Sequence, residues 1–149
     1  MKELNFSSKL DQSYLDNLRQ LFFFNKRQEN YRPQIVELIK EYGEPVIVRN
    51  GENIFLQLTD EKMNQCLFAK YHNDLVGALL YTRNTTSNIS ILHLAIDESY
   101  FSNTENSRFM LSLQLINKVK EIAGKIKGIE TISLEYSRKP GKQIILPVK

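Results

Sequence analysis

One feature constrains the fold more than any other, a long amphipathic helix predicted between two apolar segments of strand length. Apolar residues recur at helical spacing from Leu111 to Ile126, with polar residues between them. The flanking segments, Ile89–Ile96 and Thr131–Tyr136, are short and mostly apolar. Two strands of one sheet that are joined by a helix make a right-handed crossover and lie parallel. The sequence therefore predicts adjacent parallel strands at the centre of a sheet, with the helix packed across one face.

The segment before this unit is rich in strands. An Asn-Gly pair separates Val46–Val48 from Ile54–Leu56, and such a pair is the strongest short-range signal for a β-hairpin. Cys66–Lys70 and Leu75–Thr82 flank a second polar turn. Neighbouring strands joined by short turns are antiparallel. The sheet is therefore predicted to be mixed and mostly antiparallel.

Helices and a final short strand complete the predicted order. Residues 8–24 have apolar side chains at helical spacing, and a second helix is predicted from Pro33 to Gly43. The crossover helix is predicted to begin within residues 103–108 and to end near Lys125. Ile144–Val148 is predicted as a last strand. With 149 residues, the chain is expected to form a single α/β domain of the α+β type over residues 1–149.

Composition narrows the class of protein. Cys66 is the single cysteine, so no internal disulfide can form, and this favours a reducing compartment. Residues 1–7 lack the apolar core of a signal peptide, and no run of residues is long and apolar enough to span a membrane. These observations predict a cytoplasmic protein with no membrane partner.

Charge and residue clustering argue against several kinds of site. The net charge is +3, and the densest basic cluster is Arg138, Lys139 and Lys142, which is sparse for a nucleic-acid binder. Cys66 and His72 have no third group to orient them as a nucleophile and base, so a buried strand cysteine is the preferred interpretation. Two separated histidines and one cysteine do not make a metal site.

Two of the predicted strands carry a pattern that resembles one enzyme family. Asp74–Leu80, with its Val-Gly pair, resembles the strand of the GNAT N-acetyltransferase superfamily in which a turn leads into an apolar segment. Leu94–Tyr100 resembles the next strand of that family and its exit. The helix and strand that follow have the family's order, so the resemblance covers residues 67–136. On this pattern the chain is identified as a divergent or degenerate GNAT member, which implies two helices before the strands and a long helix between central parallel strands.

The resemblance also implies a site for acetyl-CoA. In the family, a strand that diverges from its neighbour pairs its backbone with the pantetheine arm, as an added strand would. The N–H groups at the start of the next helix face the pyrophosphate. The residues that the resemblance assigns to these contacts are Leu94, Ala95, Ile96, Asn106, Ser107 and Arg108.

The phosphate loop departs from the family pattern. The family uses glycines there because they let the backbone approach the phosphates, but residues 101–111 contain none. Ser102 and Glu105 match a capping box, which would place a carboxylate at the helix N-terminus in competition with phosphate.

Catalytic residues are also altered. Many family members carry a glutamate on the strand that corresponds to Ile89–Ile96, where His93 is the titratable residue of this chain. His93 is either a general base or a histidine packed in the sheet with one hydrogen-bond partner. Tyr136 ends the following strand and either replaces the family's functional tyrosine or is an aromatic residue at the rim.

Two functions from different classes follow. The first is an acyl-CoA-dependent N-acyltransferase that acts on a small-molecule or peptide amine. The second is a non-catalytic GNAT-like module that binds a ligand or a protein, since the phosphate-loop glycines and the glutamate are missing. A PAS-like or roadblock-like sensor or scaffold would give a similar order of elements.

The end of the chain raises the question of self-association. Ile144–Val148 is apolar, and an apolar strand at an open sheet edge tends to pair with another chain. One hypothesis is that this segment and Thr131–Tyr136 form the edge of a symmetric homodimer. The alternative is that the segment folds back as an edge strand within the monomer.

Overall fold

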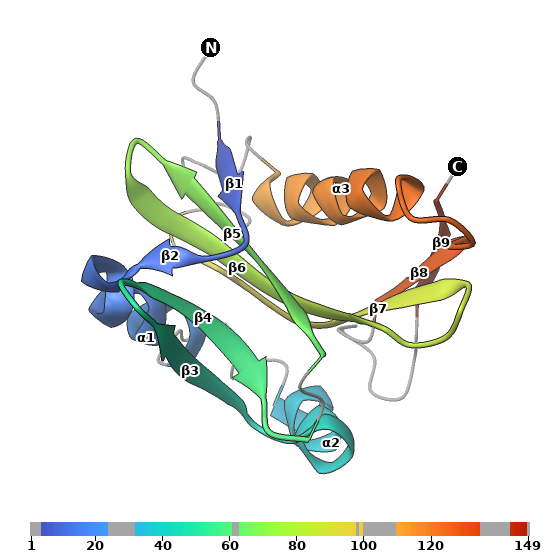
Figure 1. Cartoon of the computed structure of the whole chain (residues 1–149), viewed down its shortest axis with the longest axis horizontal. Coiled ribbons are helices and arrows are strands. Elements are labelled where there is room, and N and C mark those ends of the chain that lie inside the picture. Colours follow the sequence, from blue (N-terminus) through green and yellow to red (C-terminus); the bar gives the residue numbers. More distant parts are fainter. Residues whose placement is uncertain are drawn as a thin grey trace.

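A computed structural model describes residues 4–23, 32–60, 63–97, 99, 110–134 and 144–148 (Figure 1). These residues form nine strands, three α-helices and one 3-10 helix. The elements are, in chain order, β1 (Asn5–Ser7), β2 (Leu10–Asp11), η1 (Gln12–Tyr14), α1 (Leu15–Phe23), α2 (Arg32–Tyr42), β3 (Pro45–Asn50), β4 (Asn53–Leu58), β5 (Gln65–Tyr71), β6 (Asp74–Arg83), β7 (Asn88–Ile96), α3 (Leu111–Gly124), β8 (Thr131–Leu134) and β9 (Ile144–Pro147). None of the described helices is long and apolar enough to cross a membrane.

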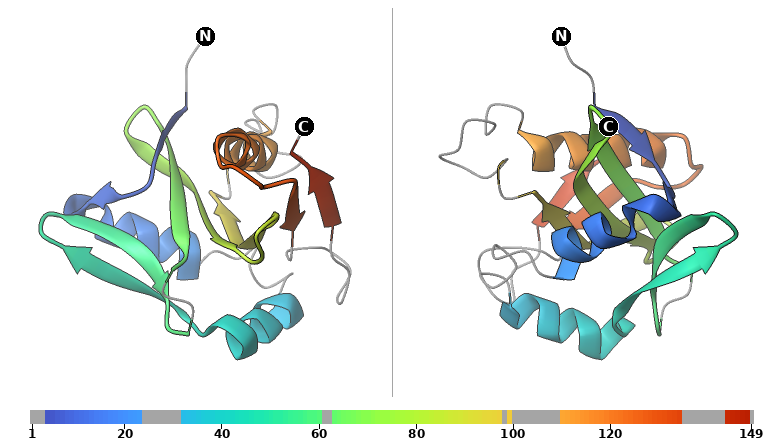
Figure 2. Two further views of the ribbon diagram at one scale, coloured as in Figure 1. Left: turned by 45° about the vertical axis from the view of Figure 1, so that its right-hand side comes forward. Right: turned by 90° about the vertical axis from the view of Figure 1, so that its left-hand side faces the viewer.

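The larger sheet has the strand order β1-β5-β6-β7-β8-β9. Its neighbouring strands are antiparallel, except that β7 and β8 are parallel and are joined through α3. α3 lies on one face of this sheet, and α1 and α2 lie on the other (Figure 2). The mixed, mostly antiparallel sheet and the crossover helix between parallel strands are therefore confirmed.

Side chains of β5, β6 and β7 alternate between two apolar cores, as the two-residue period of a strand requires, except at a bulge in β7. Leu67, Leu79 and Ile91 pack with α3, whereas Phe68 and Leu80 pack with α1 and the smaller sheet. Because both faces of these strands are covered, their sequences are almost continuously apolar.

The contact between α3 and the larger sheet depends on a glycine. A Cβ atom built on Gly77 of β6 would lie 2.8 Å from Cδ1 of Leu115, which is fully buried on α3. With any larger residue, either the Leu115 side chain or the helix would have to shift, because interiors are close-packed. The Val-Gly pair recognised in the sequence therefore sets how closely α3 approaches β6.

The smaller sheet has the order β2-β4-β3 and contains the predicted hairpin. Asn50 pairs with Asn53, so the turn consists of Gly51 and Glu52. Gly51 has φ of 65°, a conformation that glycine adopts without strain. The hairpin was predicted correctly, although its turn is one residue later than the Asn-Gly pair.

The helix predicted over residues 8–24 is wrong at its beginning. Leu10 and Asp11 form β2, which pairs with β4. The Asp11 carboxylate accepts a hydrogen bond from the Ser13 N–H, and the Gln12 N–H donates to the carbonyl of Glu52. These bonds hold the chain in strand and 3-10 conformation, so α1 begins only at Leu15.

The crossover helix also begins later than predicted. Met110 lies in the left-handed region, with φ of 48° and ψ of 49°, and a right-handed helix cannot continue through such a residue. α3 therefore starts at Leu111 rather than within residues 103–108. The sequence showed no sign of this break because the apolar spacing runs across it.

The last strand folds back within the chain. β9 pairs antiparallel with β8, from Leu134 opposite Ile144 to Thr131 opposite Pro147. The structure therefore has the intramolecular arrangement, and Thr131–Leu134 does not lie at the edge as the dimer hypothesis required. β9 itself is the edge strand.

Candidate active site

A β-bulge in β7 sets the direction of His93. Leu80 stands opposite His93, but the next residue of β6, Tyr81, stands opposite Ile91, so Leu92 is an extra residue. A bulge of this kind bends the strand and changes where side chains point. Leu92 packs in the core beside α1, and His93 lines a pocket on the same face. The bulge therefore turns two consecutive side chains toward α1 and α2.

His93 is almost fully enclosed. Its side chain is 2% exposed, and its ring lies edge-on to Phe22 of α1, with 5.9 Å between the ring centroids. Burial lowers the pKa of the imidazole to about 4, because desolvation disfavours the charged form. His93 is therefore neutral at pH 7 and is a weaker base than an ordinary histidine.

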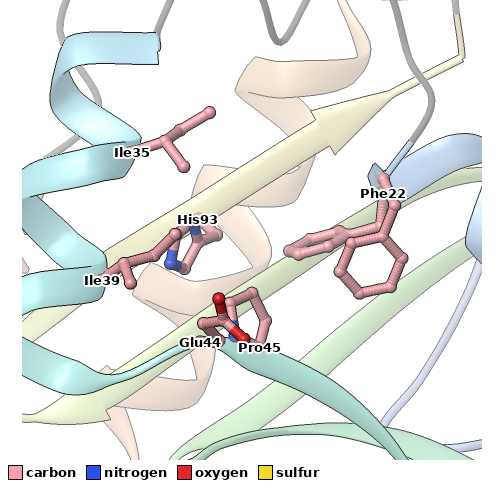
Figure 3. A pocket seen from close by; sticks show the side chains of 7 residues that line it. Phe22, Ile35, Ile39, Glu44, Pro45 and His93 are labelled. Atoms are coloured by element: carbon pink, nitrogen blue, oxygen red, sulfur yellow. The ribbon is translucent and has the colours of Figure 1, made fainter.

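A pocket of about 300 Å³ opens between α1, α2, the start of β3 and β7. In Figure 3, Ile35 and Ile39 of α2 form one side, Phe22 lies opposite, and His93 projects from β7 between them. The described residues that line the pocket are Phe22, Phe23, Ile35, Ile39, Glu44, Pro45 and His93. The walls are apolar, and two of the lining side chains, Glu44 and His93, are titratable.

Glu44 is a functional candidate that sequence reasoning missed. Gly43 ends α2 with φ of 85°, and its N–H donates to the carbonyl of Ile39 at 2.9 Å. The Glu44 N–H then donates to Thr59 Oγ1 at 3.0 Å, and the Thr59 N–H donates to the Glu44 carbonyl at 3.1 Å. These bonds fix the backbone that places the exposed Glu44 among the residues lining the pocket. Gly43 could be recognised as a helix stop, but the bonds to Thr59 leave no mark in the local pattern.

The backbone predicted to bind acetyl-CoA lies in the C-terminal half of β7. Leu94, Ala95 and Ile96 pair with β6 on one edge. Within the described residues, β8 stands opposite β7 only as far as Ile91, which faces Leu134. The His93 side chain and the Leu94–Ile96 backbone are consecutive in the strand, so they lie together because they are neighbours in the sequence.

The start of α3 lies near the C-terminal end of β7. β7 and β8 are parallel, so the helix that joins them must run antiparallel to both, from the end of β7 back to the start of β8. Met110 is the N-cap residue of α3, and no side chain among the described residues makes a capping hydrogen bond there. The first turn of α3 contains no acidic residue. Ser102 and Glu105, which match a capping box, lie outside the described residues. Asn106, Ser107, Arg108 and Tyr136 lie outside the described residues.

Cys66 has a structural environment. Its thiol is buried and donates a hydrogen bond to the carbonyl of Leu56 at 2.8 Å. Burial raises the pKa of the thiol to about 12, so the nucleophilic thiolate is scarce at neutral pH. His72 lies in the turn between β5 and β6, away from this buried sulfur. Among the described residues there is no group of three or more potential metal ligands.

Comparison with known proteins identifies the fold. No protein-family model matches the sequence, and no curated protein matches it. A probable acetyltransferase from Staphylococcus epidermidis superposes with a TM-score of 0.51 and 15% identity, over 89% of this chain and 72% of that protein. The chain has the GNAT fold.

Other solved structures with the GNAT fold match less closely. An acetyltransferase from Bacillus subtilis in complex with CoA gives a TM-score of 0.45 and 16% identity, over 90% of this chain and 64% of that one. A GNAT family acetyltransferase from Elizabethkingia anophelis with acetyl-CoA bound gives a TM-score of 0.42 and 13% identity, over 88% of this chain and 63% of that one. At such identities the likeness concerns the fold, so the chemistry must be argued from this chain's own residues.

Proposed function

We propose that this chain, working as one domain over residues 1–149, transfers the acyl group of acetyl-CoA to the nitrogen of an amine. The observation that carries the proposal is the position of the pocket. His93 lines it from β7, and the next three residues of that strand are those predicted to bind the cofactor. An amine in the pocket would thus lie beside the end of the strand where the acyl group is expected.

The described residues fit the cofactor at two places. The edge of β7 at Leu94–Ile96 extends beyond the described end of β8, and an amide-containing arm can pair with such an edge. The N–H groups of the first turn of α3 can receive a phosphate, since no side-chain cap and no acidic residue occupies this turn. Asn106, Ser107 and Arg108 precede this turn and stay as predicted phosphate contacts.

The protein's chemical task is to hold an amine and accept its proton. Acetyl-CoA would supply a thioester: a C–N bond would form and the C–S bond would break, with one proton lost by the nitrogen and one gained by the leaving thiolate, so that the products are an amide and CoA thiol. His93 is neutral at pH 7 and has a ring nitrogen that can accept the proton lost by the amine nitrogen. Its lowered pKa predicts a slow reaction at neutral pH, because a general base works best when its pKa is near the working pH. Tyr136 stays a predicted replacement for the family's functional tyrosine.

A second candidate function is a non-catalytic module that binds a ligand or a protein through the same fold. The observation in its favour is the burial of His93, which makes it a weak base on a strand that carries no carboxylate. Both functions use the same pocket, so a measurement of acetyl-CoA turnover distinguishes the acyltransferase from the non-catalytic module.

The decisive experiment combines cofactor binding with turnover. Calorimetry with acetyl-CoA should show saturable binding to the wild type. Ser112→Glu places a carboxylate in the first turn of α3, which favours the helix but repels a phosphate, so we expect about tenfold weaker binding. Ser112→Gln, of the same size without the charge, should bind like the wild type.

Turnover then tests the chemistry. Release of CoA thiol on addition of an amine would support an acyltransferase, and His93→Gln should abolish it while cofactor binding persists. A wild type that binds no acetyl-CoA at millimolar concentration would end the cofactor proposal. Binding without turnover would favour the non-catalytic module.

A further inference from the structure

The pocket that His93 lines has a composition that favours one chemical class of occupant. Its walls are the side chains of Phe22, Phe23, Ile35, Ile39 and Pro45, which are all apolar. Phe22 and Phe23 present two rings at 5.5 Å between centroids in an edge-to-face arrangement. Ligand sites of this kind bind the apolar body of a ligand and orient it with a few polar groups.

Charge in the pocket has a single sign. Glu44 is the one charged side chain among the described lining residues, and it is exposed to solvent. The structure records no ion pair between its carboxylate and a described residue. This carboxylate attracts a cation, whereas no lysine or arginine is among the described lining residues to receive an anion.

Size limits the occupant further. The volume of about 300 Å³ is at the lower end of ligand pockets. It is roughly twice that of an apolar cavity of about 150 Å³ that accommodates benzene. One aromatic ring with a short alkyl arm therefore fits, and a long polyamine or a folded peptide does not.

We infer that the acceptor is a small primary amine with an apolar, ring-sized body, and that Glu44 binds its ammonium group. This inference rests on the proposed function and specifies its substrate class. The body lies between α1 and α2, and the amine nitrogen lies between Glu44 and His93, which both line this pocket (Figure 3). The α2–β3 junction thus supplies a carboxylate to a pocket in which β7 has none.

The test uses 2-phenylethylamine as the probe and two-dimensional NMR of the ¹⁵N-labelled full chain, without acetyl-CoA. We expect saturable shifts at amides near Phe22, Ile39 and His93. Glu44→Gln should weaken 2-phenylethylamine binding about two- to fivefold, because an exposed ion pair contributes modestly. The neutral analogue 2-phenylethanol should bind Glu44→Gln and the wild type equally.

Glu41→Gln is the matched control, because Glu41 is an exposed glutamate of α2 outside the lining residues. This substitution removes the same charge nearby and should change the affinity for neither 2-phenylethylamine nor 2-phenylethanol. The inference is overturned if 2-phenylethylamine does not bind at millimolar concentration, or if Glu41→Gln and Glu44→Gln weaken it equally. Amine binding without any acetyl-CoA turnover would refute the proposed function and keep only the assignment of this pocket to a small apolar amine. Turnover with spermine or a lysine peptide, but not with 2-phenylethylamine, would support the proposed function and refute the inferred substrate class.

Discussion

The packing of α3 on the sheet can be tested by a double-mutant cycle at Gly77 and Leu115. A methyl group added by Gly77→Ala would stand 2.8 Å from Cδ1 of Leu115, well inside van der Waals contact. Leu115→Ala removes that atom from a fully buried site. Each substitution destabilises the protein alone, but together the new methyl group enters the space that the leucine has left.

The magnitudes follow from the two kinds of packing defect. Overpacking by one methyl group costs about 1–3 kcal/mol, and a buried Leu→Ala substitution costs about 2–5 kcal/mol. In the double variant the overlap disappears, and the methyl group refills part of a cavity that costs about 24 cal/mol per Å³. We therefore expect the double variant to be more stable than the sum of the single effects by about 1–3 kcal/mol.

Urea unfolding followed by far-ultraviolet circular dichroism measures these free energies, since the chain has no tryptophan. Equal slopes with urea would show that all four proteins expose the same surface on unfolding. If the two substitutions add within about 0.5 kcal/mol, the residues are not in contact. That result would refute the placement of α3 against β6, and with it the position of the proposed phosphate site.

Two further predictions concern pH and backbone conformation. Unfolded His93 takes up a proton below about pH 6.5, whereas the folded residue does so only near its lowered pKa of about 4. The unfolded state therefore binds more protons between these values, and stability should fall by up to about 3 kcal/mol from pH 6.5 to 4. His93→Gln should lose this part of the pH dependence in urea titrations. Gly43→Ala should cost about 3 kcal/mol or more, because its Cβ would overlap Thr59, while Gly51→Ala, with open space around it, should cost about 1–2 kcal/mol. A greater loss for Gly51→Ala in thermal unfolding would contradict the positions given to these turns.

Local sequence patterns were sufficient where neighbouring residues decide the structure. The hairpin at Gly51, the end of α2 at Gly43, and the strand–helix–strand unit each depend on residues within one or two turns of each other. The crossover rule then fixed β7 and β8 as parallel neighbours. For these reasons most of the fold was predictable.

Long-range pairing accounts for the errors. Leu10 becomes a strand residue because Ile54, far along the chain, pairs with it, and the helical spacing of residues 8–24 does not reveal that partner. The bulge at Leu92 is equally hidden, since Ile89–Ile96 is apolar on both sides of it. The bulge decides whether His93 faces the pocket or the opposite core, because a shift of one residue reverses a strand's faces.

The candidate site was half predictable for the same reason. His93 and Leu94–Ile96 belong to one strand, so a resemblance over that strand identifies them together. Glu44 reaches the pocket through backbone bonds to Thr59, which lies on the far side of a hairpin. No local pattern links residues 44 and 93, and only the tertiary structure places both in one cavity.

The final prediction concerns β9, whose outer edge lies at the end of the larger sheet. Ile144 and Ile145 are 44% and 59% exposed there, and exposed apolar edge strands tend to pair. We propose that β9 pairs with its counterpart in a second copy, so sedimentation should show a dimer that forms as concentration rises through the micromolar range. Ile145→Lys should abolish the dimer, while Leu113→Lys, at a similarly exposed residue of α3, should not. A wild type that stays monomeric over this range would mean that the short strand and Pro147 already protect the edge.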